Sequence, residues 1–426
     1  MQEIKETYKQ YIGKISSRYY VAKIKQITSI PVTTGAGEEA MEYDPNEIRY
    51  IRISDFDKRG VIIEDKKVSV PLAKGKKHIV QTGDILAATA GGTVGKTMMF
   101  EKTDETCCYA GYLARIRPNE KIMYSRYLFY QLQSPIMDFF RECAVKKTTI
   151  ENISATLYSN MSVIVPPLQE QKKIADYLDQ KCSEIDSVIA DLQEQIDKLE
   201  QYKRSVISET VTKGLNQKAP MKDSGISWVG MIPANWGVKR GKYIFSYIQK
   251  PTREDDGIIT CFRDGEVTLR SNRREDGFTM SDKEIGYQGI DVGDLIIHGM
   301  DGFAGAIGIS DSRGKASPVL NVLETNQSKR YFMYLLRTMA YKGVFEALST
   351  GIRVRTCDTN WGKIKNIFYI VPPVEEQMCI VNYIDEKCAE IESIIADKKQ
   401  QLEVVENYKK SLIYEYVTGK KEVVDE

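Results

Sequence analysis

The residues best suited to chemistry in this chain are clusters of Lys and Arg in presumed loops. One cluster is K-G-K-K at residues 74–77, and another contains Arg270, Arg273 and Arg274. K-K-T-T at 146–149 and R-V-R-T at 353–356 occupy equivalent places, each shortly before a V-P-P tripeptide. Basic side chains beside Ser, Thr and Asn suit DNA phosphates and base edges. A single cluster is more often a solvated loop, but the recurrence of the last pair in both halves favours a binding role.

Lys96, from a glycine-rich segment, completes the set of predicted DNA contacts. These are Lys74, Lys76, Lys77, Lys96, Lys146, Lys147, Thr148, Arg270, Arg273, Arg274, Arg353 and Arg355.

The glycine-rich segment A-G-G-T-V-G-K-T at 90–97 approximates the phosphate-binding loop G-x-x-x-x-G-K-[ST], with Ala90 in place of the first glycine. The residues that follow, M-M-F-E, do not open an amphipathic helix, and no apolar run ending in Asp suggests a metal-holding strand. We therefore predict a recognition loop or hairpin here. The second half has its own version, G-M-D-G-F-A-G at 299–305, without the lysine.

Other catalytic chemistry is not written in the sequence. The chain has two histidines and eight cysteines, and no C-x-x-C pair, so no zinc or catalytic metal site is predicted. The tetrapeptides N-P-P-Y and D-P-P-Y, which serve amino-methylation of adenine, do not occur. No glycine-rich fingerprint for binding S-adenosylmethionine stands out either. No apolar run is long enough to span a membrane. The first residues, M-Q-E-I-K, are not followed by the apolar stretch of a secretory signal peptide. The scattered thiols predict a reduced, cytoplasmic protein. Because no catalytic motif is evident, we expect that the chain is not itself an enzyme.

The net charge of the chain conceals an uneven distribution. The 426 residues have a composition typical of globular proteins, and their formal charge of +1 argues at first against nucleic acid. Residues 1–165 and 214–371 each carry +5, whereas 166–213 carry −3, 372–420 carry −4 and the tail 421–426 carries −2. This division predicts DNA at the two basic segments and protein partners at the acidic ones.

The acidic segments are an internal duplication. Residues 165–213 and 371–419 share 25 identities in 49 ungapped positions. In each copy a Pro-Pro pair is followed by apolar residues at alternating steps of three and four, with Lys398 as an exception in the second copy. This pattern predicts a long helix with a heptad seam. Two such helices, each of roughly 40 residues and about 60 Å, can bury their seams against each other as an antiparallel pair. A bundle inside a larger core is the alternative.

The segments between these helices differ from each other but share landmarks. Tyr11 and Tyr19 stand where the second half has Trp228 and Trp236, and G-D-I-L at 83–86 matches G-D-L-I at 293–296. Strands are predicted at 48–53, 60–63, 85–89, 257–262, 266–269 and 295–298, and helices at 125–140 and 329–348. A linker with Gly, Pro and Asn covers 214–225.

Two dissimilar domains, each ending in V-P-P-[LV]-x-E-Q and a long charged helix, resemble the specificity subunit of a type I restriction-modification system. K-D-S-G-I-S-W-V-G-M-I-P-A-N-W at 222–236 and I-R-Y-I-R-I-S-D-F at 48–56 are similar to the family's motifs. The resemblance implies an α/β (α+β) fold with two target-recognition domains separated by a pair of long antiparallel coiled-coil helices, a pseudo-two-fold repeat. The domains are 1–165 and 214–371, the helices 166–213 and 372–420, and the tail 421–426.

The resemblance also implies a function and partners. Each domain would read one half of a split, asymmetric sequence in double-stranded DNA, and the helices would set the spacing. Two methyltransferase subunits would dock on the chain and restriction subunits would join them, with S-adenosylmethionine, ATP and Mg on those partners and no cofactor bound directly. The repeated helix starts, Glu170, Gln171, Glu376 and Gln377, are the predicted docking residues.

Two alternatives from other functional classes remain open at this point. One is a helical adaptor that joins two protein partners without reading DNA. The other is a nucleotide-dependent enzyme that uses residues 90–97. The bases that would be read cannot be deduced, because base choice depends on loop geometry in the most divergent regions.

Overall fold

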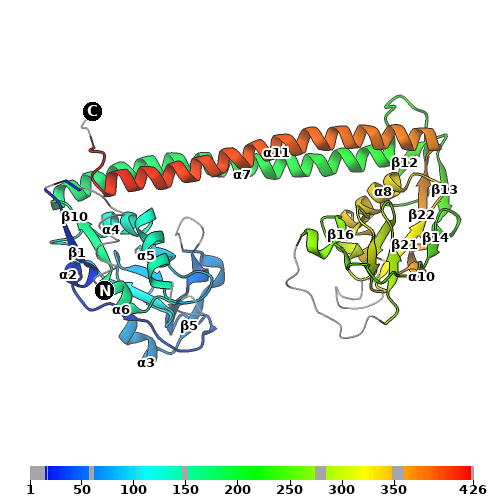
Figure 1. The fold of residues 1–426 in the computed structure, drawn as a ribbon. Helices are drawn as coiled ribbons and strands as arrows, with labels where there is room; N and C mark the ends of the chain where they lie inside the picture. Colours follow the sequence, from blue (N-terminus) through cyan, green and yellow to red (C-terminus); the bar gives the residue numbers. More distant parts are fainter. Residues whose placement is uncertain are drawn as a thin grey trace. The chain divides into compact units, whose positions relative to one another are not determined.

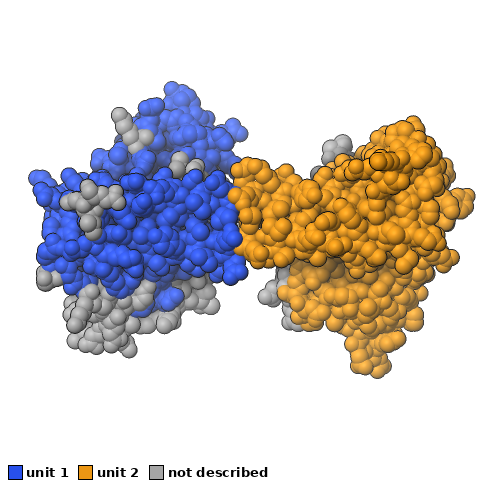
Figure 2. Space-filling view, turned by 90° about the horizontal axis from the view of Figure 1, so that it is seen from above, with its two compact units in different colours: residues 1–193, 400–426 blue, residues 194–399 orange. Residues whose placement is uncertain are grey.

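The chain folds into two compact units. The computed structural model describes residues 15–16, 18–56, 62–101, 103–145, 152–273, 285–347 and 359–423. Unit 1 comprises residues 1–193 and 400–426, and unit 2 comprises residues 194–399 (Figure 2). Each unit thus holds one domain and a stretch of each long helix. None of the helices in the described ranges is long and apolar enough to cross a membrane.

Two long helices run through the duplicated segments (Figure 1). Helix α7 covers Leu168–Lys213 and α11 covers Val374–Val417, 46 and 44 residues, so both exceed the predicted length slightly. Each begins directly after its Pro-Pro pair, where the first-turn N–H groups lack intrahelical partners and proline costs little. A left-handed glycine follows each helix, Gly214 with φ 73° and Gly419 with φ 69°. Such a glycine is a common helix terminator.

Within each unit the helices pair antiparallel and bury the predicted seam. In unit 1, Leu178 of α7 and Val417 of α11 lie in one core. In unit 2, Val211 of α7 and Ile384 of α11 do the same. Ion pairs cross between the helices at equivalent positions of the repeat. Lys409 contacts Asp186 at 2.6 Å in unit 1, and Lys203 contacts Glu392 at 3.1 Å in unit 2.

The domain of unit 1 is joined to α7 by a short antiparallel ribbon. Strand β1 (Tyr20–Lys23) pairs with β10 (Ser162–Val165), with Tyr20 opposite Val165. Two four-stranded sheets follow, in the orders β2-β9-β6-β7 and β3-β5-β4-β8. Their strands are β2 (Thr33–Thr34), β3 (Met41–Glu42), β4 (Ile48–Ile51), β5 (Val68–Val70), β6 (Ile85–Ala88), β7 (Thr97–Met99), β8 (Cys107–Tyr109) and β9 (Leu113–Ile116). Short helices include α2 (Ile24–Ile27), α3 (Leu72–Gly75) and α6 (Ala155–Asn160), with 3-10 turns at Ile53–Asp55, Glu64–Lys66 and Lys76–His78.

The domain of unit 2 repeats this plan with different details. Strand β13 (Gly237–Arg240) pairs with β22 (Phe368–Val371), which leads into α11 as β10 leads into α7. A four-stranded sheet has the order β14-β21-β18-β19, and three two-stranded ribbons accompany it. The strands are β11 (Met221–Asp223), β12 (Met231–Pro233), β14 (Ser246–Ile248), β15 (Ile259–Cys261), β16 (Val267–Leu269), β17 (Gln288–Ile290), β18 (Leu295–His298), β19 (Ile307–Ile309), β20 (Gly314–Ala316) and β21 (Leu320–Glu324). Helix α10 is Trp361–Ile364, and 3-10 turns lie at Gly241–Tyr243, Arg270–Asn272 and Gly302–Ala304.

Each unit has two hydrophobic cores. One joins the domain to the long helices, and it contains Tyr127 in unit 1 and Tyr331 in unit 2. The second lies among the strands away from the helices, around Tyr109 in unit 1 and Ile296 in unit 2. This arrangement confirms the mixed fold with two domains and paired long helices.

Both predicted domain helices are broken where the sequence contains a helix breaker. The helix predicted at 125–140 is α4 (Ser125–Leu132) followed by α5 (Pro135–Val145), because Pro135 has no N–H and favours a first turn. The helix predicted at 329–348 is α8 (Lys329–Tyr341) and α9 (Val344–Ala347), separated at Gly343 with φ 69°. The strand predicted at 60–63 is also wrong in its described part, where Ile62 makes only an isolated bridge to Phe56.

Candidate nucleic-acid interface

Helix α4 anchors the first domain to both long helices. The Tyr127 hydroxyl donates to the carbonyl of Val417 at the end of α11, at 2.9 Å. The Tyr130 hydroxyl and the Arg126 guanidinium both bond Asp179 of α7, the latter at 3.0 Å from Nε. Complete burial raises the pKa of Tyr127 well above its ordinary value, so this hydroxyl remains a neutral donor. The domain is therefore fixed to α7 and α11 together.

Helix α8 makes the same contacts in unit 2, with the helices exchanged. The Tyr331 hydroxyl donates to Val211 of α7 at 2.9 Å. The Tyr334 hydroxyl and the Arg330 guanidinium bond Asp385 of α11 at 2.6 and 2.7 Å. The repeated residues are thus the anchors of each domain, which leaves the residues that differ to shape its surface.

The repeated Gly-Asp pair is also structural. Gly83 and Gly293 have φ of 89° and 86°, a backbone conformation that favours glycine. The Asp84 carboxylate accepts hydrogen bonds from the Gln81 N–H and from Arg117. Asp294 accepts from the Asp291 N–H and from Lys250 in the same way. These pairs fix a turn before a central strand in each domain and are not free to contact DNA.

The first predicted basic cluster lies on an exposed turn of unit 1. Lys74, Lys76 and Lys77 are exposed and flank Gly75, which is buried. A Cβ at Gly75 would lie 3.0 Å from Cys108 Sγ and 3.2 Å from Ile48, so glycine lets the turn pack closely on the core. The three lysines therefore project outward, and Lys74 is paired with Glu38 at 3.1 Å.

The glycine-rich segment of unit 1 is the tip of a hairpin. Strand β6 precedes it and β7 follows it, paired antiparallel from Ile85 opposite Met99. Gly91 and Gly95 have positive φ, as tight turns require, and Lys96 is exposed. A phosphate-binding loop needs a helix after the glycines, so the strand found there argues against the nucleotide-hydrolysis alternative. Of the two predicted forms, the hairpin is confirmed, and its role in recognition stays a prediction.

The basic cluster of unit 2 is held against a second hairpin, formed by β15 and β16. Arg273 pairs with Asp264 at 2.6 Å and Glu266 at 2.8 Å, and its guanidinium lies 4.1 Å from the Phe262 ring centroid. The hydrogen bond and charge of Asp264 raise the pKa of Arg273 further, so it stays cationic. Two carboxylates nevertheless offset that charge, which makes Arg273 better suited to stiffening the hairpin than to binding phosphate.

Arg270 lies beside this hairpin, and its Nε donates to Thr260 Oγ1 at 3.0 Å. The remaining predicted contacts fall outside the described residues. They are Lys146, Lys147, Thr148, Arg274, Arg353 and Arg355. The described candidates of unit 1 lie on separate segments, those of unit 2 lie beside one hairpin, and the DNA-binding role of each stays a prediction.

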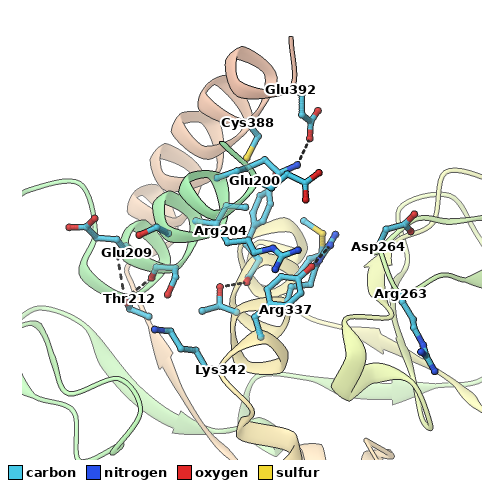
Figure 3. Close-up of a pocket in the computed structure, with 18 of the residues that line it drawn as sticks. Glu200, Arg204, Glu209, Thr212, Arg263, Asp264, Arg337, Lys342, Cys388 and Glu392 are labelled. Atoms are coloured by element: carbon cyan, nitrogen blue, oxygen red, sulfur yellow. Dashed lines mark hydrogen bonds and ion pairs between the residues drawn. The ribbon is translucent and has the colours of Figure 1, made fainter. Parts of the chain in front are cut away.

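A groove in unit 2 contains basic residues that the sequence analysis missed. It has a volume of about 1240 Å³ and lies between α7, α8, α11 and the turn joining β15 to β16 (Figure 3). Arg204 of α7 and Arg337 of α8 both approach the ring of Tyr341, at 5.2 and 5.8 Å from its centroid. These arginines sit in helices and far apart in sequence, so no loop cluster marked them. The sequence signal that could have identified these two arginines is that the equivalent residues of the other half of the repeat are not arginines.

Comparisons with known proteins find relatives of this chain along most of its length. A family model of the type I restriction modification DNA specificity domain matches residues 17–201, which span the unit 1 domain and much of α7. The type I restriction enzyme MjaVIII specificity subunit of Methanocaldococcus jannaschii is 25% identical over 362 residues, 81% of this chain and 80% of that protein. The EcoKI specificity subunit of Escherichia coli strain K12 is 22% identical over 439 residues, 96% of this chain and 90% of that protein.

By these matches the chain is similar to type I restriction-modification specificity subunits. A solved structure that concerns complex assembly and conformational transition of the type I R-M system contains a chain of the same fold. Its TM-score is 0.68 and its sequence identity 16%, and the match covers 96% of this chain and 100% of that one. At that identity the likeness shows the fold alone.

The repeated Glu-Gln pairs at the starts of α7 and α11 make mostly internal contacts. Gln171 and Gln377 are fully buried. Gln171 accepts from the Tyr124 N–H and donates to the Pro166 carbonyl, both at 2.8 Å, and Gln377 bonds Ser328 and Pro372 likewise. A docking residue must reach the surface, so the predicted docking role of both glutamines is wrong. They tie each domain to the start of its helix.

Each of the two glutamates bonds a domain residue that lies beside the end of the other long helix. Glu170 accepts a hydrogen bond from the Tyr19 hydroxyl at 2.6 Å, and Glu376 accepts one from Asn235 at 3.2 Å. Tyr19 and Trp236 cover the glycines that end the helices, Gly419 and Gly214. The predicted equivalence of Tyr19 and Trp236 is thereby confirmed. Within the described ranges, no group of three or more His, Cys, Asp or Glu is arranged to hold a metal ion.

Proposed function

We propose that the chain is the non-catalytic DNA sequence-specificity subunit of a type I restriction-modification complex, in which each domain reads one half of an asymmetric bipartite target. The observation that carries the proposal is the repeat itself. Tyr127 and Tyr331 attach the two domains to the helices by the same contacts, whereas the exposed loops differ. Two different readers on one repeated frame are what an asymmetric split target requires.

Domain exchange tests this assignment. Residues 1–165 are replaced by the corresponding domain of a relative, and the chain is co-expressed with its methyltransferase partner. Methylated bases are then mapped across the genome of the host. The expected result is a change in one half of the methylated motif, with the other half and the gap retained. A change in both halves would contradict the assignment of one domain to one half-site.

The paired helices are proposed to set the gap between the half-sites. Seven residues inserted in α7 after residue 193 and in α11 after residue 399 keep the heptad phase of both. The insertion adds about 10.5 Å of helix at the α-helical rise. At a spacing of ~3.4 Å per base pair, the gap in the methylated motif should grow by about three base pairs. An unchanged gap would show that the helices do not set it.

We further propose that two methyltransferase subunits dock on exposed apolar residues of the helices. Val188 and Ile394 are equivalent in the repeat and are 47% and 45% exposed. Tyr202 and Tyr408 are also equivalent, and both are 58% exposed. Exposed apolar side chains do not stabilise the helix pair in water, which points to a partner that covers them. Because the same side chains occur in both copies of the repeat, they fit two copies of one partner. These residues replace the buried glutamines as docking candidates, alongside the partly exposed Glu170 and Glu376.

Charge substitutions at the tyrosines test this docking. Tyr202→Arg or Tyr408→Arg should each remove one methyltransferase copy from the complex, and the double variant should remove both. Native mass spectrometry of the co-purified complex reports the stoichiometry. Tyr243→Arg is the matched control, since Tyr243 is 71% exposed but lies off the helices. Full stoichiometry in the double variant would place the docking surface elsewhere.

The same proposal assigns the chemistry to the partners. S-adenosylmethionine would be held by the methyltransferase subunits, and ATP and Mg by the restriction subunits. The purified chain without partners should therefore neither methylate nor cleave DNA that carries its target. Methylation by the chain alone would contradict the non-catalytic assignment.

A further inference from the structure

The groove of unit 2 has a positive charge balance, which its ion pairs leave unchanged. Six cationic side chains line it against four anionic ones. Two of the four carboxylates are already occupied, because Glu392 pairs with Lys203 and Asp264 pairs with Arg273. Within the described ranges of the chain, neither Arg204 nor Arg337 is paired with a carboxylate. The groove therefore presents two guanidinium groups that lack an anion.

A single aromatic ring holds both of these guanidinium groups. Tyr341 ends α8 and is 47% exposed, and Arg204 and Arg337 lie 5.2 and 5.8 Å from its ring centroid. Arg337 also donates from Nη2 to the Tyr341 hydroxyl at 2.7 Å. Cation–π contacts fix the positions of the two cations but do not neutralise them. Two like charges on one ring repel each other, so an anion between or beside them would stabilise the arrangement.

The hairpin turn next to α8 is shaped to admit Arg337. A Cβ at Gly265 would lie 1.9 Å from Arg337 Nη1, and Gly265 has φ 93°. Only glycine therefore permits both this turn and the position of the guanidinium. In Figure 3, Arg204 and Arg337 come from α7 and α8, with Arg263 and Asp264 contributed by the hairpin. Three separate elements thus converge on the arginine pair.

Unit 1 lacks this arrangement at the equivalent positions of the repeat. Arg204 corresponds to Lys410, and Arg337 and Tyr341 correspond to Gln133 and Met137. The Tyr334 and Tyr130 anchors are shared, so the difference lies on the surface and not in the frame. The arginine pair is therefore a property of unit 2.

We propose that Arg204 and Arg337 clamp a phosphate of the DNA backbone beside the half-site read by unit 2. The inference rests on the proposed DNA-reading function. A guanidinium fork binds phosphate oxygens in a bidentate manner, and a pair preset on one ring loses little side-chain entropy when it binds. The contact is independent of base sequence, so it positions the duplex on the domain and does not select the target.

The test uses the full chain in complex with its methyltransferase subunits. Arg204→Gln, Arg337→Gln and the double variant are compared with wild type on two duplexes. One duplex contains the mapped target and the other is an unrelated sequence of equal length. Affinity is measured as a function of NaCl concentration. Arg240→Gln is the matched control, because Arg240 lies 5.0 Å from the Phe368 ring in the same unit but outside the groove.

The double variant should lower the magnitude of the slope of log K against log salt by about 0.9, the value for one lost phosphate contact, and each single substitution should lower it by part of that. At 0.1 M salt that slope corresponds to about eightfold weaker binding on either duplex. The preference for the target over the unrelated duplex should stay as in wild type, and Arg240→Gln should leave the slope unchanged. Tyr341→Leu, which removes the shared ring, should weaken binding with a smaller change in slope.

Two results would overturn the clamp. Wild-type slopes in the double variant would show that the arginines meet no phosphate. Loss of methyltransferase subunits from the complex, with a normal slope in the complexes that remain, would assign the groove to an acidic protein surface. Failure of the proposed function is a separate outcome. In that case the wild-type complex would show no preference for any target, whereas the slope change could still be measured on the unrelated duplex.

Discussion

Units 1 and 2 share their frame and differ in their surface. Tyr127 and Tyr331 donate to the last turn of a long helix at the same distance, and Gln171 and Gln377 bond the same kinds of backbone groups. By contrast, unit 2 carries Arg204 and the groove that contains it, where unit 1 has Lys410. The comparison teaches that the repeated residues attach a domain to the helices. The residues that differ between the two units lie on the domain surface, where a ligand can reach them.

The largest expected effect concerns the aromatic ring that covers the end of each helix. Trp236 is buried against Gly214, and Tyr19 covers Gly419 in unit 1. Trp236→Ala should lower the free energy of unfolding by about 3–5 kcal/mol, because a large buried side chain leaves a cavity. Tyr19→Ala should cost less, since its ring is smaller and its hydroxyl reaches a partly exposed carboxylate.

Chemical denaturation gives the total loss, and amide hydrogen exchange shows which unit carries it. Faster exchange confined to unit 2 in Trp236→Ala would support two separately anchored domains. Equal acceleration in both units would break the comparison, because the domains would then unfold together.

A smaller effect is expected from the anchoring hydroxyls. Tyr331→Phe and Tyr127→Phe each remove one buried hydrogen bond to a helix-end carbonyl. Each substitution should cost about 1–3 kcal/mol, and the two costs should be similar because the contacts are equivalent. Thermal unfolding of the two variants side by side checks this. A neutral result for one and a loss for the other would mean that the two anchors differ in strength despite equal geometry.

The smallest effect is a pH dependence confined to unit 2. Hydrogen bonds from Lys250 and then Arg313 lower the pKa of Asp291 to about 2. A carboxyl whose pKa is lower in the folded state stabilises the protein above its unfolded pKa of about 4, and the contribution is lost as pH falls from there through about 2. Asp291→Asn should therefore cost up to about 1 kcal/mol at pH 7, as expected for a partly exposed pair, and only a small part of that near pH 2.

Urea denaturation across this pH range measures the difference. Asp255→Asn is a control with the same change in charge, because Asp255 is an exposed residue beside Asp256 in the same domain. A loss that stayed constant down to pH 2 would assign the effect to packing and not to ionisation.

The sequence by itself determined the long helices and the duplication. A heptad seam without Pro or Gly leaves a helix as the main way to bury Leu178 and Cys182, and both are buried in the structure. The sequence also indicated the hairpin at residues 90–97, because the segment is rich in glycine and the residues after it lack a helical pattern. The equivalence of Tyr19 and Trp236 followed from their matching positions before each domain.

Only the tertiary structure decided which polar residues face inward. Glu170 and Gln171 are adjacent and equally polar, yet Gln171 is fully buried because the domain folds back over the helix start and supplies backbone partners. Arg204 and Arg337 are likewise unremarkable as helical residues. They meet because the Tyr331 hydroxyl holds α8 against α7, and local spacing does not encode contacts between elements so distant along the chain.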